Sequence, residues 1–203
     1  MRTVRDGADA LREALRAEGG TVAGVLDRPP PLTEHLDRPG LAQHAAAGPR
    51  TCERGREYEL LLEMILEGYR LHYDEPLVVR PADADLALLL GDQLYALGLA
   101  RLAALGDLEA VTELADVISL AAQAHSAADR DLAEAVWEAG AVSVGWGASD
   151  PHRRAKERAR AHDPEAPGAL RAAADALRDS AGAPHCAAAA SRAAADARQT
   201  PGS

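Results

Sequence analysis

The sequence contains no phenylalanine, only two tryptophans and four tyrosines, and one lysine, Lys156, beside 21 arginines. Apolar residues still make up 47% of the chain, but much of that share is alanine. Few large apolar side chains therefore remain to fill a core. A binding or catalytic site that uses more than one lysine is excluded, and a site that uses one lysine must contain Lys156.

Several catalytic and targeting signatures are also missing. There is no glycine-rich phosphate loop ending in Lys-Ser/Thr, no Gly-x-Ser-x-Gly and no Cys-x-x-Cys. The two cysteines, Cys52 and Cys186, lie far apart and do not form a metal-type spacing. The N-terminal stretch is charged and lacks the apolar run of a signal peptide. We therefore expect free thiols and a cytoplasmic protein.

The charge balance is acidic, with a formal net charge of -10 at pH 7. Affinity for nucleic acids comes mainly from lysine and arginine, so we expect no nucleic-acid partner. Residues 153–160 form a short basic cluster, but Glu157 interrupts it. We interpret this cluster as a solvated helix.

The main positive feature is the apolar stretch from Asp83 to Leu105. Between Leu86 and Leu105 only Asp92 and Arg101 are charged. A helix that is apolar on every side is expected in the middle of a fold. The stretch approaches the ~20 residues that cross a bilayer, but an aspartate near its centre would be costly in lipid. We therefore predict a bundle helix and no transmembrane segment.

Apolar residues at helical spacing predict further helices over residues 4–18, 57–73, 108–126 and about 131–146. Gly106 and Asp107 suit the end of one helix and the cap of the next, which gives a tight helical hairpin. Small residues at Gly140 and Gly145 would permit close helix approach. The predicted fold class is all-α, a bundle of at least four core helices.

Three regions follow from this pattern. Residues 1–56 combine the first helix with a proline-rich, irregular arm, and residues 57–147 form the helical core. Residues 148–203 are rich in alanine and arginine and contain only two leucines. Apart from a short helix over residues 150–160, we expect this last region to be mostly disordered.

Asp92 is the first candidate functional residue. On a helical wheel it lies among Leu88, Leu89 and Tyr95, so its carboxylate is expected to be buried and to need a partner. That partner is either an arginine, a helix N-terminus or tyrosine, or else a ligand. We take Asp92, Tyr95, Tyr69 and His72 as candidates for ligand or partner contacts. His72 and His125 lack the Glu-x-x-His spacing of a bundle metal site.

A second candidate is the acidic pair Glu63 and Glu67. These residues are one helical turn apart, so both carboxylates could reach one divalent cation such as Mg²⁺. Glu59 and Arg70 share the same stripe of the helix, and such a stripe is commonly a solvated surface with an ion pair. Both interpretations remain open. If the pair is not functional, we expect no cofactor.

The run Leu88-Leu89-Leu90-Gly91-Asp92-Gln93-Leu94-Tyr95-Ala96, followed by Leu102-Ala103-Ala104-Leu105-Gly106, resembles a segment of the trans-isoprenyl diphosphate synthases. In that all-α family a Gly-Asp helix follows the helix that carries the first aspartate-rich motif. The corresponding region here is Glu63-Met64-Ile65-Leu66-Glu67. The resemblance covers about residues 58–125 and implies an isoprenoid-synthase-like bundle.

This chain departs from the catalytic members of the family. It has two glutamates in place of clustered aspartates, and Tyr73-Asp74-Glu75-Pro76 in place of a basic run. No second aspartate-rich motif follows, and the substrate-binding lysines are absent. The resemblance is therefore nearest to the non-catalytic small subunits of heterodimeric prenyl diphosphate synthases, which keep the Gly-Asp helix.

The resemblance implies a pseudoenzyme that acts as a partner or regulatory subunit in isoprenoid metabolism and is not catalytic on its own. Its partner would be a prenyl synthase subunit or a second copy, and an isoprenoid could occupy a hydrophobic tunnel. One alternative is a helical scaffold protein that forms homo-oligomers. Another is a degenerate magnesium-dependent prenyl diphosphate enzyme that uses Glu63 and Glu67.

Overall fold

The protein is a helical bundle, seen in a computed structural model that describes residues 2–26, 36 and 38–180. Its helices are α1 (Val4–Glu18), α2 (Gly20–Ala23), α3 (Leu41–Ala47), η2 (Cys52–Arg54), α4 (Gly55–Tyr73), α5 (Ala84–Ala104), α6 (Leu108–Ser126), α7 (Arg130–Trp146), α8 (Asp150–Arg160) and α9 (Ala166–Ser180). Within the described ranges, β-type pairing is limited to one isolated bridge between Leu26 and Val79. The predicted all-α class is confirmed.

The boundaries of the helices match the sequence pattern closely, because capping residues fix them. α1 and α6 have the predicted bounds, and α4, α5 and α7 each begin within two residues of prediction. The side chain of Asp83 accepts a hydrogen bond from the amide of Leu86 at 2.8 Å and so caps α5. Asp107 caps α6 in the same way, through the amide of Ala110 at 3.1 Å. The predicted tight hairpin between α5 and α6 is therefore present.

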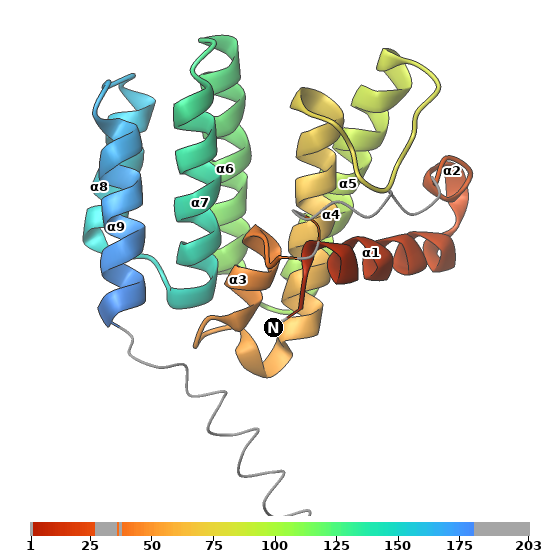
Figure 1. Ribbon diagram of the computed structural model, residues 1–203, viewed down its shortest axis with the longest axis horizontal. Helices are drawn as coiled ribbons and strands as arrows, with labels where there is room; N and C mark the ends of the chain where they lie inside the picture. Colours follow the sequence, from red (N-terminus) through yellow and green to blue (C-terminus); the bar gives the residue numbers. More distant parts are fainter. Residues whose placement is uncertain (1, 27–35, 37, 181–203) are drawn as a thin grey trace, which may run out of the picture.

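Helix α4 occupies the centre of the bundle. Most of its residues are buried, and it packs against α1, α3 and α5. Figure 1 shows α4 and α5 as one upright pair, α6 and α7 as another, and α3 near the base between them. The larger core cluster joins α4 to α3, α6, α7 and α9, and a smaller one joins it to α1 and α5.

Helix α5 lies at the edge of the bundle, which corrects the expectation that it would be the central, buried helix. Only 28% of its most apolar stretch is buried. The buried side consists of Leu90, Gly91, Leu94, Gly98 and Leu102, and it packs mainly on α4. Hydropathy alone does not distinguish a central helix from an outer helix with a second apolar face.

By length and composition, α5 is the one helix in the described part of the chain that could cross a membrane. A single helix of this kind is weak evidence for a membrane span, since helices of water-soluble bundles pass the same test. It also packs extensively against α4. The expectation of no transmembrane segment is consistent with this arrangement.

Glycines bring helix α7 unusually close to its neighbours. A Cβ atom at Gly145 would lie 2.6 Å from the backbone oxygen of Ala45 on α3, and one at Gly140 would lie 2.2 Å from a methyl group of Val117 on α6. Neither distance leaves room for a side chain. The predicted role of small residues in this helix is therefore confirmed at Gly140 and Gly145.

Residues 150–180 fold onto the core, which corrects the prediction that nearly all of residues 148–203 are disordered. The short helix expected over residues 150–160 is present as α8, and α9 packs against α7 and α8. Leu170 is 1% exposed, and several alanines of α8 and α9 are buried around it. Burying alanine costs no side-chain entropy, so few large residues suffice. Residues 181–203 lie outside the described residues.

The predicted irregular arm also contains more structure than expected. Within residues 21–56, α3 and the short helices α2 and η2 form wherever no proline interrupts the chain. The buried face of α3 includes Ala42, Gln43, Ala45 and Ala46. Much of the remaining arm, residues 27–35 and 37, lies outside the described residues.

We predict that Leu170→Ala will lower the free energy of unfolding by about 2–5 kcal/mol, because it leaves a cavity between α9 and the core. Urea denaturation followed by circular dichroism measures this value. Leu177→Ala serves as the control, because Leu177 is only partly buried and should cost about 1 kcal/mol or less. An unchanged midpoint for Leu170→Ala would mean that α9 is not part of the cooperative fold.

Candidate functional site

Two of the three exposed large apolar side chains of the described chain lie on the outer face of α5. This face is formed by Leu88, Leu89, Asp92, Gln93, Ala96, Ala100 and Ala103. These residues follow one another at helical spacing and point away from α4. Leu89 is 63% exposed and Leu88 is 48% exposed, which is unusual for side chains of this size. An apolar helix face that nothing covers is typical of an interaction surface.

Asp92 lies on this outer face, and its side chain is 75% exposed. The expectation that its carboxylate is buried is therefore wrong. The wheel placed Asp92 among leucines correctly, but those leucines are themselves exposed. Its Oδ1 atom is 3.2 Å from Nε2 of His72 on α4, a contact that is an ion pair when the imidazole is protonated and that does not form a hydrogen bond. Because the carboxylate is exposed, Asp92 needs no ligand to compensate a buried charge.

The other predicted ligand candidates fall into two groups on either side of α4. His72 stacks on Tyr95 of α5, with ring centroids 5.4 Å apart and planes 4° apart. Tyr69 faces α6 and α7 instead, and its hydroxyl lies 2.8 Å from Nε2 of His125. Asp92, His72 and Tyr95 therefore form one cluster, and Tyr69 belongs to a second. The two clusters adjoin at Tyr73, whose ring centroid is 5.6 Å from that of His72.

The second cluster contains Tyr69, Tyr73, His125 and Trp137, contributed by α4, α6 and α7. Tyr73 and His125 stack with centroids 4.2 Å apart, and Tyr69 meets Trp137 edge-on at 5.1 Å. These side chains line a cavity of about 350 Å³. In a chain with so few aromatic residues, such a concentration is notable. Sequence reasoning missed this cluster, because its contacts join three helices that apolar spacing does not place side by side.

The acidic residues of α4 form a buried row, which corrects the interpretation of a solvated stripe. Glu59, Glu63 and Glu67 are all buried along one side of the helix. Oε1 of Glu67 accepts hydrogen bonds from the amides of Val78 and Val79 at 2.6 and 2.9 Å, and Oε2 accepts one from Leu77 at 3.0 Å. Glu67 therefore fixes the loop between α4 and α5.

Glu63 is held by polar side chains from two directions. Its Oε1 accepts a hydrogen bond from Nε2 of Gln43 at 2.9 Å, and Arg70 lies 3.6 Å from its Oε2. Arg70 also pairs with Glu67 at 3.3 Å. Burial raises the pKa of Glu63, because the charged carboxylate loses water that these partners only partly replace. Glu67 is thus fully engaged within the protein, whereas Oε2 of Glu63 has the ion pair with Arg70 but no hydrogen bond.

Within the described ranges, no group of three or more histidine, cysteine, aspartate and glutamate side chains is arranged to hold a metal ion. Glu63 and Glu67 remain the residues that the sequence offers for Mg²⁺. To bind it, Glu67 would have to release the loop amides, whereas Glu63 would have to turn its buried Oε2 away from Arg70. Unsatisfied buried amides are costly, so the observed contacts favour a structural role.

A buried ionic cluster between α6 and α8 was not expected from the sequence. Glu113 accepts hydrogen bonds from Lys156 at 2.7 Å and lies 2.7 Å from Nε2 of His152. Lys156 also reaches Asp116 at 2.7 Å. A sequence signal for it exists. His152 and Lys156 are four residues apart and Glu113 and Asp116 are three residues apart, so each pair lies on one face of its helix. The single lysine of the chain therefore holds α8 in place.

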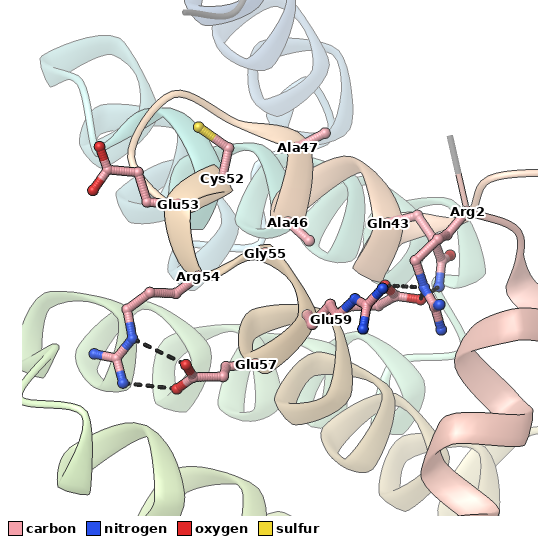
Figure 2. A pocket seen from close by; sticks show the side chains of 11 residues that line it. Arg2, Gln43, Ala46, Ala47, Cys52, Glu53, Arg54, Gly55, Glu57 and Glu59 are labelled. Carbon is pink, nitrogen blue, oxygen red and sulfur yellow. Dashed lines mark hydrogen bonds and ion pairs between the residues drawn. The ribbon is translucent and has the colours of Figure 1, made fainter. Parts of the chain in front are cut away.

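Figure 2 shows a second, wider pocket of about 510 Å³, between α3, η2 and the start of α4. Arg2 lies at one side and pairs with Glu59 at 2.7 Å, and Arg54 pairs with Glu57 at 2.7 Å. These charged side chains satisfy one another, so the pocket shows no preference for a ligand of either sign.

Cys52 lies on the rim of this pocket and is part of a disulfide. The expectation of a free thiol is therefore wrong at Cys52. Cys186 lies outside the described residues. The cytoplasmic location was inferred partly from free thiols, and it loses that support.

We predict that the free energy of unfolding will depend on pH through Glu63. Since the pKa of Glu63 is raised in the folded state, its stabilising contribution is present below the ordinary value of 4.5 and is lost as the pH rises through the folded-state pKa. Urea denaturation of wild type and Glu63→Gln between pH 4.5 and 7.5 should therefore show a flatter profile for the variant.

Glu113→Gln provides a buried control of opposite sign. Contacts with His152 and Lys156 overcome desolvation and lower the pKa of Glu113, so its contribution is present above the ordinary value and is lost in acid. This variant should lose stability at neutral pH, and the difference from wild type should shrink as the pH falls. Parallel profiles for wild type and Glu63→Gln would contradict the assignment of Glu63.

Comparison with known proteins gives no relative for this chain. No protein-family model matches it. No curated protein and no solved structure matches it either. Its function therefore has to be argued from its own surfaces and contacts, and the resemblance to prenyl diphosphate synthases stays a prediction.

Proposed function

We propose that this chain is a non-catalytic helical partner protein that binds another protein through the outer face of α5. The observation that carries the proposal is the exposure of Leu88 and Leu89 on a helix whose opposite side is already buried against α4. Covering a contiguous apolar face releases about 25 cal/mol per Å². A partner helix with a matching apolar stripe would supply that cover.

The charge on the outer face indicates what kind of partner fits. Asp92 lies in the middle of the face, and the only basic residue of α5, Arg101, forms an ion pair with Glu18 of α1. A second copy of the same face would therefore bring another Asp92 and no base. A different chain, apolar with an arginine or lysine opposite Asp92, is the better complement.

The resemblance to prenyl diphosphate synthases lies in the same helix, at Gly91 and Asp92. We propose that the partner is a catalytic prenyl diphosphate synthase chain and that this protein acts as its small or regulatory subunit. A catalytic role for this chain alone is less well supported, because Glu63 and Glu67 are engaged by Gln43, Arg70 and the loop amides. Asp74 and Glu75 would also repel a diphosphate.

A homo-oligomeric scaffold is the second candidate function. Ala96, Ala100 and Ala103 follow the leucines on the outer face, and small side chains allow two helices to approach closely. This arrangement would use the same surface as the heteromeric complex. Light scattering on the isolated protein distinguishes the two, since a stable monomer argues against the scaffold.

We predict that Leu89→Glu will weaken association with a co-expressed prenyl diphosphate synthase by at least about tenfold, because it places a charge in the centre of the buried contact. Affinity purification through a tag on the synthase, followed by titration, measures the loss. The product chain length of the synthase should revert to that of the synthase alone.

Leu108→Glu is the matched control, because Leu108 is a leucine of similar exposure, 66%, at the far end of the α5–α6 hairpin. It should leave association nearly unchanged, and both variants should keep the circular dichroism spectrum of the wild type. The absence of any complex with the wild-type chain, together with unchanged products, would remove the prenyl synthase proposal.

A further inference from the structure

We propose that the cavity between α4, α6 and α7 binds a small organic cation of the alkylammonium class. The cavity measures about 350 Å³, which is within the size range of small-ligand clefts. It lies on the side of α4 that faces α7, whereas the outer face of α5 packs on nothing in the described chain. The proposal therefore does not depend on the proposed partner.

Aromatic side chains form the walls of the cavity. Tyr69 and Tyr73 come from the last turns of α4, and Trp137 comes from the middle of α7. Their rings are inclined to one another, at 46° between the two tyrosines and 60° between Tyr69 and Trp137. Where a ring face borders the cavity, its π electrons attract cations, quaternary ammonium groups above all.

The charges around the cavity favour the same sign of ligand. Five ionic side chains line it: Arg70, Asp74, Arg130, Glu134 and Glu138. Arg70 is already paired with Glu63 and Glu67 on its own helix. Glu138 is paired with Arg171 at 2.9 Å.

Three charged groups then remain to act on a ligand. Asp74 and Glu134 attract a cation, and Arg130 repels it. All three act on the hydroxyl of Tyr69, where the two carboxylates raise its pKa and Arg130 lowers it, in addition to the larger effect of burial. The pKa of His125 is lowered by burial and by Arg130, so this ring is neutral at pH 7 and adds no positive charge. The remaining balance is one net negative charge at an aromatic-walled cavity.

Trp137 provides a further, independent indication of a ligand. Its side chain is 3% exposed, and its indole Nε1 is buried without a hydrogen-bond partner in the described part of the chain. Buried indole donors normally find an acceptor. Trp137 lines the cavity, but the protein covers its Nε1 atom. A hydroxyl-bearing or ether-bearing ammonium would supply the missing acceptor where its binding opens a path to this donor.

Choline is a suitable probe, and its uncharged isostere 3,3-dimethylbutan-1-ol is the matched control. Isothermal titration calorimetry on the full chain should show that choline binds at least about fivefold more tightly than the isostere, because only choline carries the charge. Equal affinity for the two compounds, no binding of choline, or tighter binding of acetate than of choline would each overturn the proposal.

Two exposed residues on the rim give opposite expectations. Glu134→Gln should weaken choline binding, and Arg130→Gln should strengthen it, each by about twofold to fivefold. Glu13→Gln, an exposed glutamate on α1 remote from the cavity, should leave the affinity unchanged. Weaker binding in Arg130→Gln would show that the cavity prefers an anion and would overturn the proposal. Because these side chains are exposed, the variants are expected to fold, which circular dichroism checks.

Discussion

The row of buried carboxylates on α4 is the interaction on which the rest of the structure depends. Each member holds a different segment: Glu59 pairs with Arg2 before α1, Glu63 accepts from Gln43 of α3, and Glu67 accepts from the amides that lead to α5. A buried charge is costly unless it is fully partnered. The three segments therefore have little freedom to pack elsewhere, and α4 becomes the centre of the bundle.

This central position of α4 determines what α5 can do. Leu90, Leu94 and Leu102 hold α5 against one side of α4. Among residues 108–180, no helix crosses the other side of α5, because α6 turns away at the Gly106–Asp107 hairpin. The apolar residues that suggested a buried rod are thus divided between an intramolecular contact and an open surface. The fold and the candidate interaction surface therefore have the same cause. The helices that pack on α4 determine which side of α5 is buried and which side stays open.

Local features of the fold could be predicted from the sequence, and long-range features could not. Caps at Asp83 and Asp107 and the spacing of apolar residues determine where helices begin and end, so most boundaries were correct. Hydropathy does not reveal which helix is central, so it predicts a buried Asp92, which is exposed, and allows a solvated stripe at Glu63 and Glu67, which are buried. A ligand or partner role for Tyr69, His72 and Tyr95 stays a prediction. The sequence could not show that Tyr69 meets His125 and Trp137, because those contacts join three helices.

The crossing of α3 and α7 also restricts how this fold can vary over evolution. The backbones approach so closely at Gly145 and Gly48 that even one methyl group would collide with a carbonyl group of the opposing segment. Arg50, two residues after Gly48, fixes the same crossing. Its amide donates a hydrogen bond to the oxygen of Gly145 at 3.0 Å, and its side chain forms an ion pair with Asp107, the cap of α6. A chain that keeps this crossing must keep glycine at both positions, whatever happens to its surface. These two glycines are therefore a better marker of distant kinship than the leucines of α5.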